Sequence, residues 1–153
     1  MAYHFVAQLL KDKGPDPAEE IAAVLAEGRA HERGHAIFAT RMTGKDWRPS
    51  RPAFAIVFYR AADGTIGGLV AEIVNRLKDP TNIPPIYENH RAVMKGWWHL
   101  KNPRPFKKGL KMEDISGYST TNSPASFTFD GKCTFAYWDL EYSPYDTMCA
   151  PVK

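Results

Sequence analysis

Ala53-Phe54-Ala55-Ile56-Val57-Phe58-Tyr59 is followed by Ala62-Asp63-Gly64 and then by a second largely apolar run over residues 65–77. Short runs of apolar, β-branched and aromatic side chains favour buried strands. Asp-Gly between two such runs is typical of a hairpin turn, so the two runs are predicted to pair as antiparallel strands. The adjacent glycines Gly67 and Gly68 allow a bulge or a sharp coil in the second strand.

One helix is predicted ahead of this hairpin, beginning at Pro17 and ending near Arg33. Asp16 is a favourable N-cap, proline is favourable at the first helical position, and Glu19 stands at the third. Gly34 is expected to stop the helix. The residues that share one face of the helix are Ile21, Val24, Leu25 and Gly28.

Further strands are predicted at residues 3–10, 35–41, 97–101, 126–129 and 132–138. Pro103-Arg104-Pro105 is expected to interrupt the strand at residues 97–101, and residues 110–115 are expected to form one helical turn. Asp130-Gly131 predicts a second hairpin turn. One early helix with five or six strands indicates an α+β fold with a small curved sheet or barrel.

The chain has 153 residues, which is the usual size of one domain, so residues 1–153 are interpreted as a single domain. Its two cysteines, Cys133 and Cys149, form no disulfide framework and no CxxC pair. No apolar run is long enough to span a membrane, and the N-terminus lacks the features of a signal peptide. We therefore expect a soluble, cytoplasmic protein with no membrane partner.

Positive charge is concentrated in two blocks of the sequence. Residues 28–60 carry seven Lys and Arg against two acids, and residues 91–111 carry seven with no acid. Such blocks attract polyanions if the fold brings them to one face, whereas the alternative is a solvated lysine-rich loop. Trp47, Trp97 and Trp98 lie within the blocks, and aromatic faces among cations suit stacked nucleic-acid bases.

His31-Glu32-Arg33-Gly34-His35 fits HExxH, in which two histidines one helical turn apart bind zinc and the glutamate is a general base. This interpretation requires residues 31–35 to be helical and needs a third ligand, for which Glu72 is the best candidate. The competing interpretation is a polar helix end, where the two histidines lie near the last carbonyl groups. A small zinc-dependent hydrolase is the alternative function on the first of these interpretations.

A second pattern runs through most of the chain. Its central parts are Ile56-Val57-Phe58-Tyr59, Gly64-Thr65-Ile66-Gly67-Gly68 and Val70-Ala71-Glu72-Ile73-Val74, followed by Lys78-Asp79-Pro80 and the proline-basic-proline step at residues 103–105. Over about residues 35–115 this order resembles the EVE and YTH domains of the PUA-like superfamily. The resemblance implies a PUA-like pseudo-barrel of about five to six strands flanked by a few helices.

In these families a pocket accepts one base, often a modified and probably methylated one, flipped out of DNA or held in RNA. The resemblance thus implies a nucleic-acid-binding module that needs no cofactor and performs no chemistry itself. Such modules act as targeting parts of restriction or RNA-processing systems, so an effector such as a nuclease is a possible partner. A metabolite-binding domain on the same barrel is a further alternative.

The resemblance also suggests which side chains bind. The candidates for the aromatic pocket are Trp47, Tyr59, Trp97 and Trp98, with Arg41 and Thr43 at the loop that contacts the base edge. Trp97 and Trp98 are adjacent, so on a strand they point to opposite faces and at most one of them lines a given pocket. The candidates for phosphate contacts are Lys101, Arg104, Lys107 and Lys108.

Overall fold

The computed structural model describes residues 3–10, 15–40, 53–77, 83–93, 96–111, 135–140 and 143–150. Its elements follow the order β1 (Tyr3–Leu9), α1 (Pro17–Ala30), β2 (His35–Thr40), β3 (Ala53–Arg60), β4 (Ile66–Leu77), η1 (Pro85–Val93), β5 (Gly96–Pro105), β6 (Phe135–Leu140) and α3 (Pro144–Met148). The α+β class predicted from the sequence is confirmed. No helix within these ranges has the length and apolar character that crossing a membrane requires.

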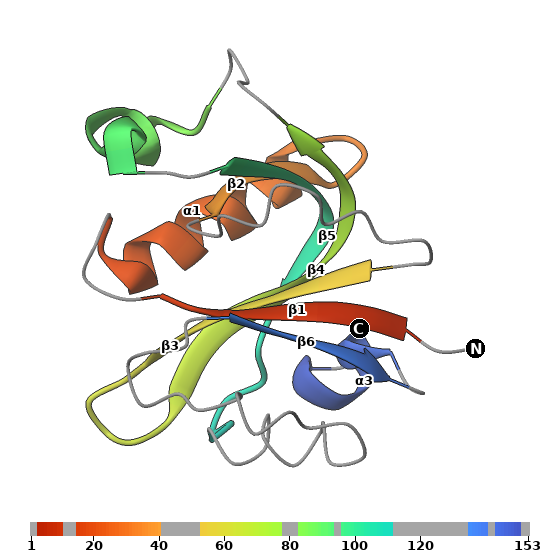
Figure 1. The fold of residues 1–153 in the computed structure, drawn as a ribbon. Helices are drawn as coiled ribbons and strands as arrows, with labels where there is room; N and C mark the ends of the chain where they lie inside the picture. The colour runs from red at the N-terminus through yellow and green to blue at the C-terminus, as the bar shows by residue number, and fades with distance from the viewer. Residues whose placement is uncertain are drawn as a thin grey trace.

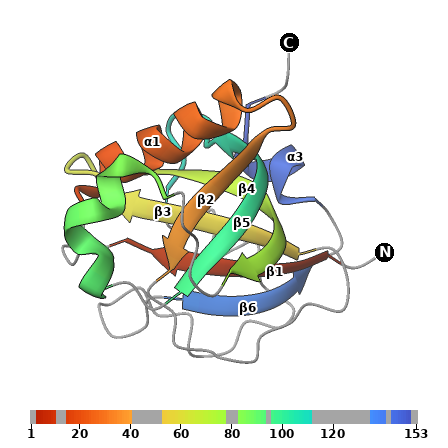
Figure 2. The ribbon, with the colours of Figure 1, turned by 90° about the horizontal axis from the view of Figure 1, so that it is seen from above.

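The six strands form one sheet in the order β2-β5-β4-β3-β1-β6 (Figure 1). The central four, β2-β5-β4-β3, are antiparallel throughout. β1 runs parallel to β3, and β6 returns antiparallel on the other side of β1. Seen from above, β2 and β5 cross the direction of β3, β1 and β6 at a steep angle, so the sheet is strongly curved (Figure 2).

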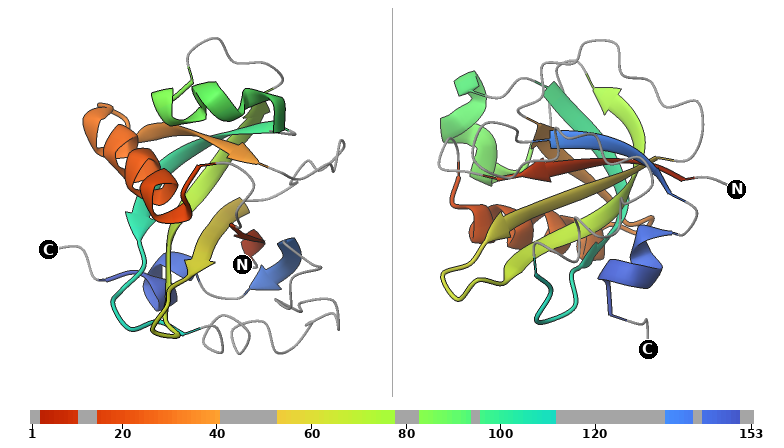
Figure 3. Two further views of the ribbon diagram at one scale, coloured as in Figure 1. Left: turned by 90° about the vertical axis from the view of Figure 1, so that its left-hand side faces the viewer. Right: turned by 60° about the horizontal axis from the view of Figure 1, so that its bottom comes forward.

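The predicted hairpin forms as expected, with β3 and β4 paired from Phe54–Glu72 to Arg60–Ile66. Its turn is closed by a hydrogen bond from the Ala61 N–H to the Thr65 carbonyl, at 2.9 Å. Gly64 has a φ of +88°, a left-handed conformation that glycine adopts without steric cost. The segment after β5 lies beside this hairpin, and both project from the same end of the sheet (Figure 3).

Helix α1 begins as its sequence predicts, because the Asp16 side chain accepts a hydrogen bond from the Glu19 N–H at 3.2 Å and Pro17 opens the first turn. It ends earlier than predicted, at Ala30, with His31 as an extended C-cap. Gly34, at a φ of +72°, then turns the chain into β2. The prediction that Gly34 stops the helix is therefore wrong, because the helix has already ended at Ala30 and Gly34 ends the turn that follows it.

The prediction that Pro103-Arg104-Pro105 interrupts the strand is wrong, because β5 continues through these residues to Pro105. β2 pairs with β5 only from Gly96 to Lys101, so the prolines lie where one side of β5 has no strand partner in the described sheet. Proline has no N–H to donate and is tolerated at such an edge. Asn102, at a φ of +52°, marks the change of direction just before them.

Two apolar cores lie on the two faces of the β2–β5 pair. The larger one packs α1 against the sheet and contains Val24, Phe38, Val57, Leu69 and Trp98. The smaller one packs Tyr87 of η1 against Trp97 and Ala39. Neither η1 nor α3 was predicted from the sequence, so the packing of η1 against Trp97 was not foreseen.

A buried carboxylate joins α1 to η1. Glu20 is 0% exposed, and its carboxylate accepts a hydrogen bond from the Tyr87 hydroxyl at 2.5 Å. The Tyr87 ring in turn meets Trp97 edge to face, with ring centroids 5.5 Å apart. A buried carboxylate requires such donors, because burying it without them carries a large desolvation penalty.

Replacing Tyr87 by phenylalanine removes this donor and leaves the ring in place. We expect Tyr87→Phe to lower the free energy of unfolding by about 1–3 kcal/mol, measured by urea denaturation. Tyr145→Phe is the matched control, because the Tyr145 hydroxyl donates at 2.8 Å to the Asn102 carbonyl at an exposed site. Equal midpoints for wild type and Tyr87→Phe would show that the Tyr87 hydroxyl contributes nothing.

Candidate functional site

A groove of about 560 Å³ opens between the first half of α1, the β3–β4 hairpin and the segment that follows β5. Ligand-binding clefts commonly have volumes of about 300–1,000 Å³, so this volume suits a small organic group. The residues that line the groove are Ala18, Ile21, Ala22, Leu25, Tyr59, Asp63, Thr65, Ile66, Gly67, Gly68, Pro105, Phe106, Lys107, Lys108 and Gly109. We call it the hairpin groove. It joins one predicted pocket aromatic, Tyr59, to two predicted phosphate contacts, Lys107 and Lys108.

Tyr59 lines the groove with a half-buried ring held by its cross-strand neighbour, Gly67. A Cβ atom at Gly67 would stand 2.5 Å from the Tyr59 hydroxyl oxygen and 2.6 Å from Cζ. Only glycine lets the ring lie this close to β4. Gly67 thus allows the close approach of an aromatic ring, whereas the glycine pair was expected to allow a bulge or a sharp coil.

The opposite wall is formed by residues 105–109, and backbone hydrogen bonds fix it at both ends. The Phe106 N–H donates to the Gly68 carbonyl at 2.9 Å, and the Lys107 N–H donates to the Met148 carbonyl at 2.9 Å. Beyond the wall, the Ile66 N–H donates to the Leu110 carbonyl at 2.9 Å. The exposed side chains of Lys107 and Lys108 therefore extend from an anchored backbone.

A carboxylate stands at the hairpin end of the groove. Asp63 accepts hydrogen bonds from the Thr65 hydroxyl at 2.6 Å and from the Thr65 N–H at 3.0 Å. These donors hold the pKa of the Asp63 carboxyl below its ordinary value, so the group stays ionised at neutral and mildly acidic pH. Two carboxylate oxygens retain acceptor capacity for a further donor, such as an amino group of a ligand.

Trp97 and Trp98 point to opposite faces of β5, as predicted, but both side chains are buried in the apolar cores. Trp97 is 5% exposed in the smaller core and Trp98 is 1% exposed in the larger one. Phe38 packs against Trp98 with ring centroids 5.8 Å apart. Neither indole lines the hairpin groove, so neither can stack on a base bound there.

The four predicted phosphate contacts fall into three places. Lys107 and Lys108 border the hairpin groove, whereas Lys101 lies opposite His35 in the β2–β5 register. Arg104 ties the C-terminal segment to β5: it donates to the Ala150 carbonyl at 2.5 Å, and its guanidinium carbon lies 5.1 Å from the centre of the Tyr145 ring. Arg41, Thr43 and Trp47 lie outside the described residues, so their proposed contacts with a base stay predictions.

The HExxH residues do not form the helical zinc motif. The helix ends at Ala30, before the motif, and His35 already belongs to β2. Glu72, the expected third ligand, pairs with Phe54 and Lys101 within the sheet. Among the residues that the structure describes, no three His, Cys, Asp or Glu side chains are placed to hold a metal ion.

The two histidines of the motif meet in a different way, together with a histidine that the motif does not contain. The rings of His31 and His35 stack with centroids 4.9 Å apart and planes 4° apart, and His99 of β5 meets His35 edge-on at 4.4 Å. We call these three residues the histidine cluster. Desolvation and the neighbouring charges of His99, His31, Lys101 and Arg33 lower the pKa of His35. Desolvation, with His31, lowers the pKa of His99.

Sequence reasoning missed Phe106, Thr65 and His99. Thr65 was predicted within the second strand of the hairpin and within the pattern that resembles EVE and YTH domains, and neither Thr65 nor Phe106 was predicted to line a site. The place of His99 depends on the register between β2 and β5, in which it lies opposite Ile37. No spacing within the sequence gives that register.

Comparison of the chain with models of protein families, with curated proteins and with solved structures found no match. The function of the groove is therefore argued from its own residues.

The contact between Tyr59 and Gly67 is tested by a double-mutant cycle. We expect Gly67→Ala to cost about 1–3 kcal/mol of unfolding free energy, because the new methyl group displaces the Tyr59 ring. In a Tyr59→Ala background the same change is expected to cost less by about 1 kcal/mol or more, measured by urea denaturation. Additive costs would mean that the ring does not rest on Gly67.

The histidine cluster predicts that the protein loses stability on acidification. The folded-state pKa values of His35 and His99 lie below those of an unfolded histidine, so the unfolded chain takes up protons first as pH falls. We expect the urea midpoint to fall between pH 7.5 and pH 5.5, and to fall less in His99→Gln. The same slope in His99→Gln as in wild type would contradict this assignment.

Proposed function

We propose that the protein is a nucleic-acid-binding module that takes one base into the hairpin groove. The observation that carries the proposal is the juxtaposition, in one cleft, of an aromatic ring, two exposed lysines and a carboxylate, provided by Tyr59, Lys107, Lys108 and Asp63. Tyr59 and Asp63 are suited to contacts with the base, and the two lysines are suited to contacts with the phosphates. The resemblance to EVE and YTH domains supports the same ligand class and a PUA-like pseudo-barrel as the finer description of the fold.

The Tyr59 ring provides the stacking surface. A base taken out of a helix loses its stacking, and an aromatic wall restores about 1–3 kcal/mol. The apolar side chains of Ile21, Leu25 and Ile66 line the same groove and favour the burial of an added methyl group. A methylated base therefore gains more in this groove than an unmodified one, and we propose a modified base as the preferred ligand.

The charged residues are suited to different parts of the nucleotide. Lys107 and Lys108 are exposed at one wall and are suited to the phosphates that flank the bound base. Asp63, ionised at neutral pH, is suited to accept a hydrogen bond from an exocyclic amino group, which adenine and cytosine carry. A thymine or uracil base has no such donor.

The test is binding of short labelled DNA and RNA oligonucleotides, unmodified or carrying N6-methyladenine or 5-methylcytosine. We expect tighter binding to one modified oligonucleotide and a loss of about 5- to 150-fold in Tyr59→Ala, which corresponds to the stacking energy. Tyr59→Phe is the matched control, because it keeps the ring and should bind within about twofold of wild type. Trp47→Ala in the same panel tests the remaining predicted pocket aromatic.

Salt dependence tests the two lysines. Each phosphate contact to a single strand contributes about −0.7 to the slope of log K against log salt, so Lys107→Gln with Lys108→Gln should flatten the slope by about 1.4. Arg29→Gln, in the last turn of α1, removes a cation outside the groove and should leave the slope unchanged. Wild-type affinity in Tyr59→Ala together with an unchanged slope in the double-lysine variant would overturn the proposal. Binding of free nucleotides with no binding of oligonucleotides would instead favour a metabolite-binding domain.

A further inference from the structure

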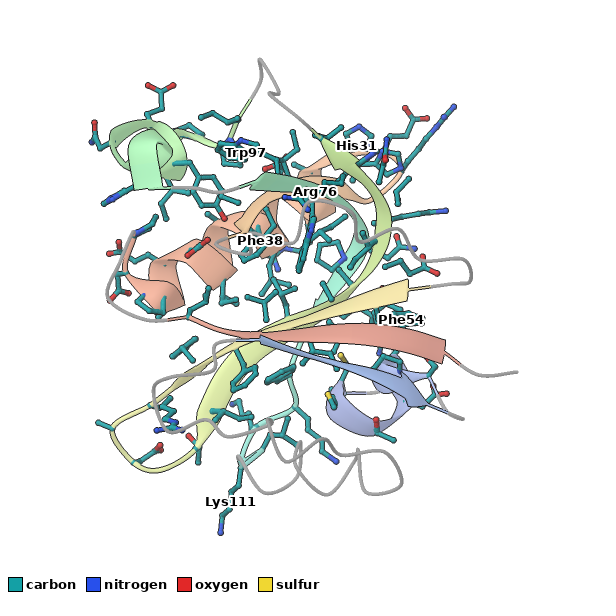
Figure 4. All side chains as sticks on the ribbon, viewed as in Figure 1. His31, Phe38, Phe54, Arg76, Trp97 and Lys111 are labelled. Carbon is teal, nitrogen blue, oxygen red and sulfur yellow. The ribbon has the colours of Figure 1, made fainter. Side chains whose placement is uncertain are left out.

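The histidine cluster lies far from the hairpin groove. Figure 4 shows His31 beyond the end of α1 and Lys111 at the opposite side of the molecule. Lys111 bridges to Thr65, which lines the groove. No residue of the cluster lines the groove, so the role of the cluster is separate from base binding.

Three separate segments bring the imidazole rings together. His31 is the C-cap of α1, His35 begins β2 and His99 lies on β5. The Nδ1 atom of His31 accepts a hydrogen bond from the Arg33 N–H at 3.0 Å. Its Nε2 atom therefore carries the proton and is a donor, because a neutral imidazole has one donor and one acceptor nitrogen. His31 is exposed and His35 and His99 are partly exposed, so a solute can reach the cluster.

Charges of both signs lie around the cluster. Lys101 lies directly opposite His35 in the strand register, and Arg33 stands in the turn between His31 and His35. On the acidic side, the Glu27 carboxylate of α1 already accepts the Ile37 N–H at 3.2 Å, and Glu72 of β4 lies opposite Lys101. Exposed Glu32 completes the turn.

Protonating stacked histidines beside two permanent cations is unfavourable unless an anion enters, since like charges at this separation repel. A tetrahedral oxyanion meets that need, because it presents several acceptor oxygens to N–H donors that come from different directions. We propose that the histidine cluster, with Lys101, is a pH-dependent binding site for phosphoryl oxygens. The ligand is a phosphate ester, either a free phosphomonoester or the backbone of a nucleic acid.

The pH dependence follows from linkage. An anion that binds the protonated cluster better than the neutral one raises the pKa values of His35 and His99, which are lowered in the free protein. Binding is therefore weak at pH 7.5 and tightens as pH falls through the histidine range. Burial raises the pKa of the nearby Glu27 carboxyl, so any negative charge that Glu27 loses on acidification acts in the same direction.

The first experiment follows the Cε1–H resonances of the histidines by NMR in the whole chain, from pH 8 to pH 5. Titrations are made at equal ionic strength in sodium chloride and in sodium sulfate, whose dianion keeps its charge over this range. We expect sulfate to raise the pKa values of His35 and His99 by about 0.5 or more, equivalent to about threefold tighter binding to the protonated form.

The second experiment identifies the source of the phosphoryl group. A labelled fifteen-residue oligothymidine is bound at pH 7.5 and pH 5.5 by wild type, His35→Gln and Tyr59→Ala. If the nucleic-acid backbone is the ligand, wild type binds more tightly at pH 5.5 and His35→Gln loses that gain, while Tyr59→Ala weakens binding at both pH values. A sulfate effect without any effect of His35→Gln on the oligonucleotide identifies a free phosphomonoester as the ligand.

The proposal is overturned if the titrations of His35 and His99 coincide in the two salts and His35→Gln keeps the wild-type pH dependence of oligonucleotide binding. If Tyr59→Ala alone does not weaken oligonucleotide binding, the result counts against the hairpin groove and does not affect the proposal for the histidine cluster. The urea midpoint of each variant at pH 7.5 shows that it is folded.

Discussion

The pairing of one long strand, β4, on both of its sides is the constraint on which the rest of the structure depends. β4 pairs with β3 between Ile66 and Glu72 and with β5 between Leu69 and Leu77, so only its middle has a strand partner on each side. Shifts in its register with β5 between Val70 and Glu72 and between Ile73 and Asn75 bend the strand. One end of β4 therefore forms a wall of the hairpin groove, while the other reaches the core beneath η1, where Leu77 packs.

Helix α1 relates the two candidate sites to one another. Its first half lines the hairpin groove, and its C-cap supplies His31 to the histidine cluster. Between them, Glu20 fixes the helix to η1 through the Tyr87 hydroxyl. The spacing of the two candidate sites is thus set by a rigid helix.

Local sequence patterns predicted the elements whose cause is local. Asp16-Pro17 placed the start of α1, and Asp63-Gly64 placed the β3–β4 turn, because capping and turn formation depend on neighbours in the chain. Pro103 was misjudged, because its tolerance depends on where β2 stops pairing with β5. His99 was missed for a related reason, since only the strand register brings it to His35. The burial of Trp97 depends on η1, a cover that no periodicity in the sequence indicated.

The carboxylate of Glu27 has a consequence for the behaviour of the protein at high concentration. β2 lies at the end of the described sheet, and an edge strand with free N–H groups can add a strand from another molecule. Here the Ile37 N–H already donates to Glu27, and α1 packs along β2. An incoming strand would have to displace a charged, half-buried acceptor from this edge. The same bond that anchors the end of α1 thereby protects the protein against edge-to-edge aggregation.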